Sequence, residues 1–223
     1  KNYLENRYVI AGELIRPGRY YISHASAMAI HGLTTQPVLG VQISSAVRKK
    51  GLAVSGIKFS FFRVKPSAQF GIEERWVTKQ DKVNVSDLEK TIVDCLARPE
   101  LCGGVSEAAK GIWSAKARID YVKLLEYVKK AGIKAVAKRL GFILQLLELS
   151  DKDTLAELKK YAHSSEAYVL FDPTLKNTGK YLREWRLRIN FNPEELKMAV
   201  WAEMIHFSEI EHVASKAGVP AET

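Results

Sequence analysis

Hydrophobic residues in the first third of the chain fall in short runs separated by Gly, Ser and Pro. These runs are rich in Val, Ile and Phe, which favour the pleated backbone of a sheet. The pattern predicts strands over three segments: Val38–Ser44, Lys58–Val64 and Arg75–Thr78. A short apolar helix is predicted over His24–His31, with Ser23 placed to cap its start and Gly32 to end it.

From Ser86 onward, apolar residues recur every three or four positions, as they do on the buried face of a helix. In the first such helix the apolar residues are Leu88, Ile92, Val93 and Leu96. The same spacing predicts an αα-hairpin whose first helix ends at Gly132, followed by a shorter helix over Thr154–Ala162.

Beyond these helices, apolar and polar side chains alternate from Trp185 onward, within the segment Tyr181–Phe191. This two-residue period predicts a half-exposed strand with a basic face, and Pro193 suits the first turn of a following helix. The whole pattern predicts an α+β protein. A small mixed sheet in the first third packs on a helical bundle, followed by a late basic strand and C-terminal helices.

The stretch Asn84–Trp113 combines a helix start, a helix stop and a pair of glycines. Ser86 is placed to cap a helix that begins at Asp87, and Glu89 is placed to complete an S-x-x-E capping box. Asp94 follows two apolar residues in this helix, so we expect it to be half-buried. We expect its carboxylate to form a hydrogen bond with a neighbouring backbone group or an arginine. The alternative is that it contacts a partner molecule directly.

The end of this helix is marked by Pro99, because a proline pushes the residue before it out of the helical region. Gly103 and Gly104 then supply the conformational freedom for a turn into the next helix. We treat five residues of the stretch as a structural signature: Ser86, Glu89, Asp94, Gly103 and Gly104.

The run VSDLEKTIVDCLARPELCGG within this stretch resembles the AbiE-type antitoxins, the regulator half of type IV toxin–antitoxin pairs. Ser23–Gln36 and Ala135–Leu149 are similar to segments of the same family and occur in the family's order. The resemblance implies that residues 20–191 are a non-catalytic antitoxin body. It further implies a cognate nucleotidyltransferase toxin as the functional partner and a link to regulation of the shared operon.

Both ends of the chain depart from the family's pattern. Family members carry an N-terminal winged helix, for which residues 1–19 are too short, and we interpret these residues as a remnant or linker. Residues 192–223 predict acidic C-terminal helices. Within them, Met204–Thr223 resembles the extreme N-terminus of the partner toxin, and the alternative is an ordinary acidic helix.

Charge is distributed unevenly along the 223 residues, which carry a formal net charge of +9. Acids outnumber lysines six to two in residues 192–223, so the positive excess lies in the rest of the chain and favours a polyanionic or acidic partner. No apolar run reaches the roughly 18 residues of a membrane span, and no signal peptide is recognisable. We therefore expect a cytoplasmic protein without membrane association, in which Cys95 and Cys102 are free thiols.

Motifs for catalysis or cofactor binding are not found in the sequence. Neither a phosphate-binding glycine loop nor a zinc-spaced cysteine pair occurs. His24 and His31 share a helical face, but no third ligand stands at a useful spacing, so we predict a buried, hydrogen-bonded His31 instead of a metal site. The sequence implies no enzyme activity, no metal and no cofactor.

Basic residues provide the candidate contact sites. They form three clusters: Arg48, Lys49 and Lys50; Lys134, Lys138 and Arg139; and Arg183, Arg186 and Arg188. The second cluster is expected outside the apolar stripe of its helix, and all three would bind a partner or nucleic-acid phosphates if they converged on one face. The alternative to an antitoxin is a nucleic-acid-binding transcriptional regulator whose DNA contacts lie in this body.

Overall fold

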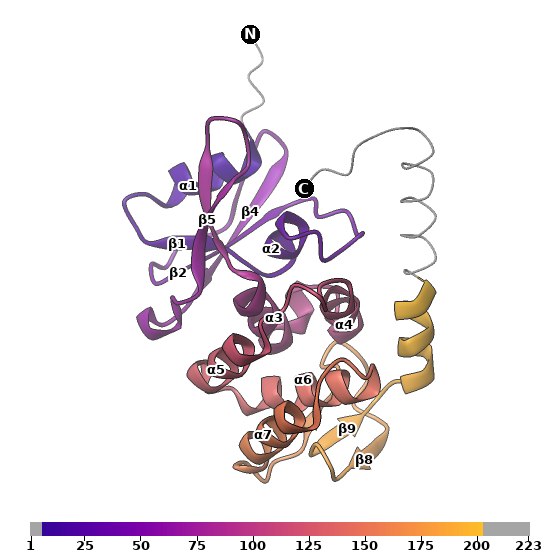
Figure 1. The fold of residues 1–223 in the computed structure, drawn as a ribbon. Helices are drawn as coiled ribbons and strands as arrows, with labels where there is room; N and C mark the ends of the chain where they lie inside the picture. Colours follow the sequence, from indigo (N-terminus) through magenta and orange to yellow (C-terminus); the bar gives the residue numbers. More distant parts are fainter. Residues whose placement is uncertain (1–5, 203–223) are drawn as a thin grey trace.

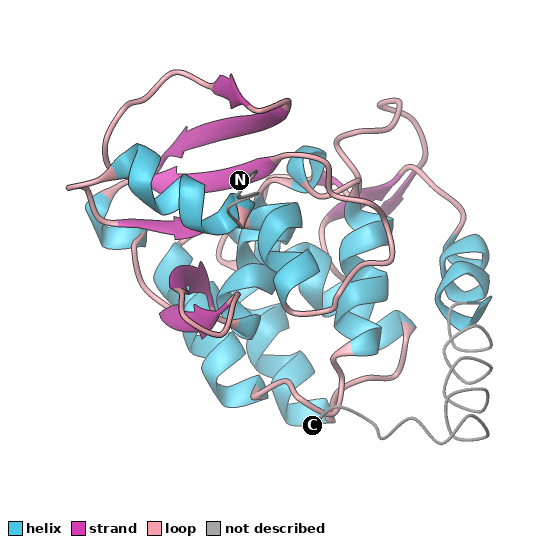
Figure 2. Cartoon of the chain, turned by 90° about the horizontal axis from the view of Figure 1, so that it is seen from above, coloured by secondary structure: helices cyan, strands magenta, loops and turns pink. Residues whose placement is uncertain are grey.

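The computed structural model describes residues 6–202, in which a six-stranded sheet lies beside a group of helices that carries a small second sheet (Figure 1). Viewed from above, the strands gather in separate groups and helices fill the middle of the molecule (Figure 2). This arrangement confirms the predicted α+β class, with a mixed sheet in the first half packed on helices.

The first sheet has the strand order β3-β4-β2-β1-β6-β5. Its strands are β1 Tyr20–Ile22, β2 Val41–Ser45, β3 Leu52–Val54, β4 Ile57–Arg63, β5 Ile72–Trp76 and β6 Lys82–Ser86. It is a mixed sheet, because β1 runs antiparallel to β2 but parallel to β6, and β2 runs parallel to β4. Three of the strands, β1, β3 and β6, were not predicted, since two are only three residues long and the third directly precedes a helix.

Helix α1, Arg7–Ile15, covers one face of this sheet. Its buried side chains Tyr8, Ala11 and Ile15 pack with Tyr20 and Ile22 of β1 and with the central strands. The intervening strand residue, Tyr21, points to the opposite face, where the helices lie. The segment expected to be a linker before residue 20 therefore contributes to the core of the sheet.

The other helices follow α1 in the order α2 His24–Ile30, α3 Leu88–Ala97, α4 Val105–Ser114, α5 Tyr121–Ala131, α6 Lys134–Leu146 and α7 Lys152–His163. Single turns of 3-10 helix lie at η1, Pro66–Ala68, and at η2, Pro99–Leu101.

Residues 193–202 are helical, as Pro193 predicted, whereas the expected toxin-like segment Met204–Thr223 lies outside the described residues. No helix in residues 6–202 has the length and apolar character needed to cross a membrane.

The second sheet has the order β7-β9-β8, with β7 Val169–Leu170, β8 Lys180–Leu182 and β9 Leu187–Ile189. The predicted strand is therefore shorter than expected, and Trp185 and Arg186 lie in the turn that precedes it. Trp185 is fully buried, and a Cβ added to Gly141 of α6 would overlap its ring. The glycine thus lets the small sheet pack directly against α6.

The start of α3 differs from the predicted capping box by one residue. Ser86 is the last residue of β6, and its Oγ lies 2.7 Å from Thr91 Oγ1. Asp87 is the capping residue instead, and its Oδ1 accepts a hydrogen bond from the backbone N–H of Lys90 at 2.9 Å. Pairing in the sheet holds Ser86 in the strand, so the next residue that favours the N-cap position takes the role.

Gly141→Ala is expected to lower the free energy of unfolding by about 1–3 kcal/mol, because the added methyl group overpacks the contact with Trp185. Urea unfolding followed by circular dichroism measures the change. In the double variant Gly141→Ala/Trp185→Phe the smaller ring leaves room, so the loss should be less than the sum of the two single losses. Strictly additive losses would contradict the proposed contact.

Candidate partner and nucleic-acid interface

Helix α3 lies between the first sheet and the other helices, and the polar groups at its start contact α5 (Figure 1). Asp87 Oδ2 accepts a hydrogen bond from the Tyr127 hydroxyl at 3.0 Å. Glu89, which is buried, forms an ion pair with Lys123 at 2.8 Å and accepts a hydrogen bond from the backbone N–H of Asp120 at 3.0 Å. Glu89 therefore joins α3 to α5 and does not form the predicted capping box.

The ion pair with Glu89 changes the pKa of Lys123. Burial lowers the pKa of Lys123, but hydrogen bonds to Glu89 and Asp87 outweigh this effect and hold the pKa above its ordinary value. Lys123 therefore stays protonated at neutral pH. The two acids at the start of α3 also suit the positive end of the helix dipole.

Asp94 is half-buried, as expected, but its partners differ from those predicted. Its carboxylate forms an ion pair with Lys90, one turn earlier in α3, and its Oδ2 lies 3.3 Å from the hydroxyl of Tyr21. The Lys90 side chain is only 3% exposed. A lysine of the same helix therefore takes the place of the expected arginine or backbone group.

Gly103 and Gly104 form the predicted turn, with φ angles of +82° and +95°. Asp172, distant in sequence, completes the start of α4, because its Oδ2 accepts a hydrogen bond from the backbone N–H of Val105 at 2.7 Å. A Cβ on Gly104 would approach that oxygen to 2.8 Å. The second glycine is thus needed both for its φ angle and for the close approach of Asp172.

Arg139 does not lie on the surface of α6, where it was predicted. It is 6% exposed and donates to three backbone oxygens, namely Phe171 O at 2.9 Å, Leu96 O at 2.7 Å and Leu170 O at 3.1 Å. Burial lowers its pKa, while Asp172 opposes that effect. The guanidinium fork matches several oxygens at once, so Arg139 has a structural role.

Lys138 is also buried, contrary to the prediction. Its ammonium donates to the backbone oxygens of Ser165, at 3.2 Å, and of Ala167. Burial lowers the pKa of Lys138, and the nearby charges of Arg186 and Lys134 add to this effect. Lys134 itself is half-buried, with its ammonium over the ring of Tyr161 at 3.3 Å from the centroid. The second predicted cluster is therefore mostly internal.

The first basic cluster lies in the loop after β2, at the end of the molecule formed by the first sheet. Arg48 and Lys50 are exposed there. Lys49 is half-buried, donates to Leu14 O and lies over the ring of Phe61 at 5.4 Å from the centroid. Only two of the three side chains are therefore available to a partner.

The third cluster lies at the opposite end, on the second sheet (Figure 1). Arg183 is exposed in the turn before β9, and Arg188 donates to Asn177 Oδ1 at 2.7 Å. Arg186 has a φ of +50°, and within residues 6–202 its Nη1 is a buried nitrogen without a hydrogen-bond partner. The structure thus brings Arg186 near Lys134 and Lys138 but keeps the loop after β2 apart from them.

Two exposed tyrosines accompany this third cluster. The Tyr168 and Tyr181 rings meet edge to face with centroids 5.1 Å apart, and the Arg188 guanidinium lies 5.3 Å from the centroid of Tyr181. Tyr181 is paired with Arg188 across β8 and β9, so both side chains project from the same face of the sheet. We call Tyr168, Tyr181 and Arg188 the tyrosine–arginine face.

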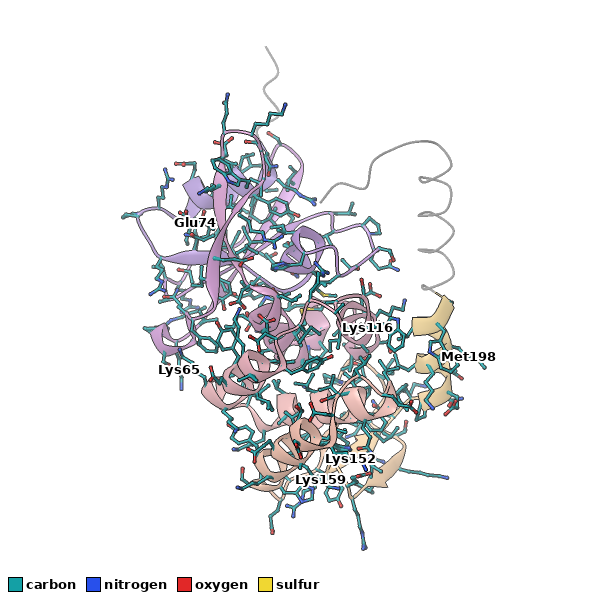
Figure 3. The ribbon with its side chains drawn as sticks, viewed as in Figure 1. Lys65, Glu74, Lys116, Lys152, Lys159 and Met198 are labelled. Atoms are coloured by element: carbon teal, nitrogen blue, oxygen red, sulfur yellow. The ribbon has the colours of Figure 1, made fainter. Side chains whose placement is uncertain are left out.

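Further charged groups surround this face. Lys180 and Arg183 are exposed beside it, while Lys159 of α7 forms an ion pair with Glu184 at 3.0 Å. Lys152 and Lys159 project at this end of the molecule, far from Glu74 on the first sheet (Figure 3). Aromatic rings beside unpaired cations are the combination that stacks nucleic-acid bases and binds the adjoining phosphates.

Together, the sheet, the helices and the small second sheet define a mixed α+β protein, and the candidate site described above is a surface on the second sheet. No family model and no curated protein matches the chain. Among solved structures, the chain is similar to the crystal structure of the RV2827C protein from Mycobacterium tuberculosis, with a TM-score of 0.56 and 14% identity. The match covers 82% of this chain and 68% of that chain, and at this identity it shows a shared fold alone.

Arg139→Met is expected to lower the free energy of unfolding by about 3 kcal/mol or more, because it leaves three buried carbonyl oxygens without their donor. Arg139→Lys should recover less than half of this loss, since an ammonium cannot match the geometry of the guanidinium. Urea denaturation measures both variants, with exposed Arg48→Met as the matched control. A loss no larger than that of the control would refute the structural role of Arg139.

Proposed function

We propose that this chain is a non-catalytic antitoxin of the type IV class, which counters a nucleotidyltransferase toxin and takes part in regulating the shared operon. The observation that carries the proposal is that the three sequence blocks resembling this class form one packed unit. They are Ser23–Gln36, Asn84–Trp113 and Ala135–Leu149.

Direct hydrogen bonds join these blocks. His31 Nε2, in the first block, lies 2.6 Å from Ser86 O in the second, and Thr34 Oγ1 donates to Glu107 Oε1 at 2.6 Å. The third block is joined to the second by Arg139, which binds Leu96 O. The three segments that resemble one family, although separated in the sequence, are therefore in direct contact, and this contact supports the proposal.

The tyrosine–arginine face is the surface we assign to neutralisation. For a toxin that transfers nucleotides to a nucleic-acid acceptor, a protein that stacks the bases of that acceptor and binds its phosphates is a competitor. Tyr168 and Tyr181 supply the rings, and Arg183 and Arg188 supply positive charge. This mode needs no stable complex between antitoxin and toxin.

The double variant Arg183→Glu/Arg188→Glu is expected to abolish rescue when it is expressed together with the cognate toxin, because reversed charges repel phosphate. The control Arg48→Glu/Lys50→Glu reverses the same number of charges at the other end of the molecule and should retain rescue. Colony counts under toxin induction measure the effect, and thermal melts confirm that both variants fold. Equal rescue by the two variants would exclude the assigned face.

Tyr181→Ala is expected to weaken binding of a 12-nucleotide single-stranded RNA by roughly tenfold, whereas Tyr181→Phe, which keeps a stacking ring, should bind like the parent protein. Fluorescence anisotropy at several salt concentrations measures the dissociation constant. The matched control is Trp76→Ala, which removes an aromatic side chain that is 63% exposed on β5. An equal loss for Tyr181→Ala and Trp76→Ala would contradict the assignment.

A duplex of the operon's promoter separates this proposal from a transcriptional regulator whose DNA contacts lie in the body. The antitoxin body should bind the duplex weakly, without sequence preference and with a steep dependence on salt. Binding that is much tighter to the promoter than to scrambled DNA would favour the regulator.

A further inference from the structure

A cavity of about 180 Å³ lies where the first sheet meets the helices. Its walls come from the end of β4 and the segment after it, from β1, α2 and α3, and from the turn between α5 and α6. Phe62 and Phe70 line it from the first of these segments, and Ile133 lines it from the turn. The cavity therefore lies apart from the tyrosine–arginine face, which is on the second sheet.

Four polar side chains with little or no exposure line one part of this cavity, and none of them belongs to the face proposed for neutralisation. They are Tyr21, His24 and Lys90, which are buried, and Asp94, whose side chain is 13% exposed. Lys90 pairs with Asp94, and its Nζ lies 3.4 Å from the Tyr21 hydroxyl. Charged and polar side chains gathered at a cavity are the groups through which a ligand would be oriented, and this makes the cavity a candidate binding site.

His24 is held in an unusual conformation at this site. Its φ is +52°, a region that residues other than glycine seldom occupy, and its Nδ1 lies 2.8 Å from Ser23 Oγ. Ser23 Oγ in turn lies 2.8 Å from Ser44 Oγ, which fixes the ring to β2. Burial lowers the pKa of His24 to about 4, so the ring is neutral at pH 7. Backbone strain of this kind occurs preferentially at ligand sites.

Positive charge exceeds negative charge around the cavity. Arg63, Lys90 and Arg98 line it, against Asp94 alone. Within residues 6–202, Arg98 donates a hydrogen bond to Glu100 Oε1 through Nε, at 2.5 Å, and its two amino groups have no hydrogen bond there. Lys90 and Lys130 also lie over the ring of Phe70, at 4.9 and 4.6 Å from its centroid. An anion is therefore favoured over a cation or a neutral ligand.

The lining residues and the volume of the cavity limit the shape of the anion that it can hold. Phe62, Phe70 and Tyr21 offer aromatic surface, which prefers edge or offset contacts with another ring. An apolar cavity of about 150 Å³ is known to admit benzene, so the space here suits one ring and a small substituent. We propose that the cavity binds a single-ring aromatic carboxylate, with the ring against Phe62 and Phe70 and the carboxylate toward Arg98 and Lys90.

Calorimetric titration of the whole chain with benzoate tests this proposal. Benzoate is expected to bind at millimolar concentration. Cyclohexanecarboxylate, which lacks the aromatic ring, and benzyl alcohol, which lacks the charge, should each bind at least fivefold more weakly. No heat of binding with benzoate, or binding of inorganic phosphate as tight as that of benzoate, would overturn it.

Two variants assign the binding to this cavity. Arg98→Met removes the exposed charge and should weaken benzoate binding about tenfold, the effect of losing one charged hydrogen bond. Ala68→Leu, which fills part of the cavity, should abolish binding. Arg48→Met is the control and should bind benzoate like the parent protein. Thermal melts establish that the variants fold, and unchanged benzoate affinity in Arg98→Met would place the ligand elsewhere.

Discussion

The buried guanidinium of Arg139 is the interaction on which the arrangement of the helical half depends. It contacts Leu96 O at the end of α3 and the oxygens of Leu170 and Phe171, at and just after β7. The carbonyls in the last turn of a helix lack partners within the helix, and a buried cation needs several acceptors. The Arg139 guanidinium and these backbone oxygens therefore satisfy one another's hydrogen bonds only while α3, α6 and β7 keep their relative positions.

The position of α4 also depends on this network, through Asp172, the residue that follows Phe171. Phe171 precedes Asp172, whose carboxylate accepts the first free N–H of α4 at Val105, beside the close approach at Gly104. The same segment leads, through the β7 pairing with β9, to the tyrosine–arginine face. Tyr168 and Tyr181 are thus presented by strands that a buried polar network holds in place. A surface fixed in this way loses little conformational entropy when it binds a ligand.

Sequence patterns predicted those parts of the structure that depend on local spacing. The helices from α3 to α7, the turn at Gly103 and Gly104, and a buried, hydrogen-bonded His31 follow from periodicity and from glycine or capping chemistry, whereas the partner of His31, Ser86 O, is known only from the structure. The two free thiols, Cys95 and Cys102, are also confirmed as buried.

Contacts between distant segments could not be predicted in the same way. Lys138 and Arg139 stand outside the apolar stripe of their helix, and a helical pattern assigns such residues to solvent. They are buried because the segment from Ser165 to Phe171 returns over α6, and its backbone oxygens accept hydrogen bonds from their side chains. Similarly, only the tertiary structure shows that Asp94 contacts Tyr21, or that Ser86 is the last residue of β6 and not the N-cap of α3.

The separation of the basic clusters decides which of them is the better candidate for a polyanion. Arg48 and Lys50 are exposed on a loop, and the aromatic ring that contacts this cluster, Phe61 under Lys49, is half-buried. At the second sheet, Arg186 keeps a buried Nη1 without a partner in residues 6–202, close enough to Lys138 to lower its pKa. An unsatisfied buried donor beside like charges is costly unless an anion or water completes it. The exposed side chains of Tyr168, Tyr181 and Arg183 adjoin it, and for this reason we assign the proposed phosphate contacts to this end of the molecule.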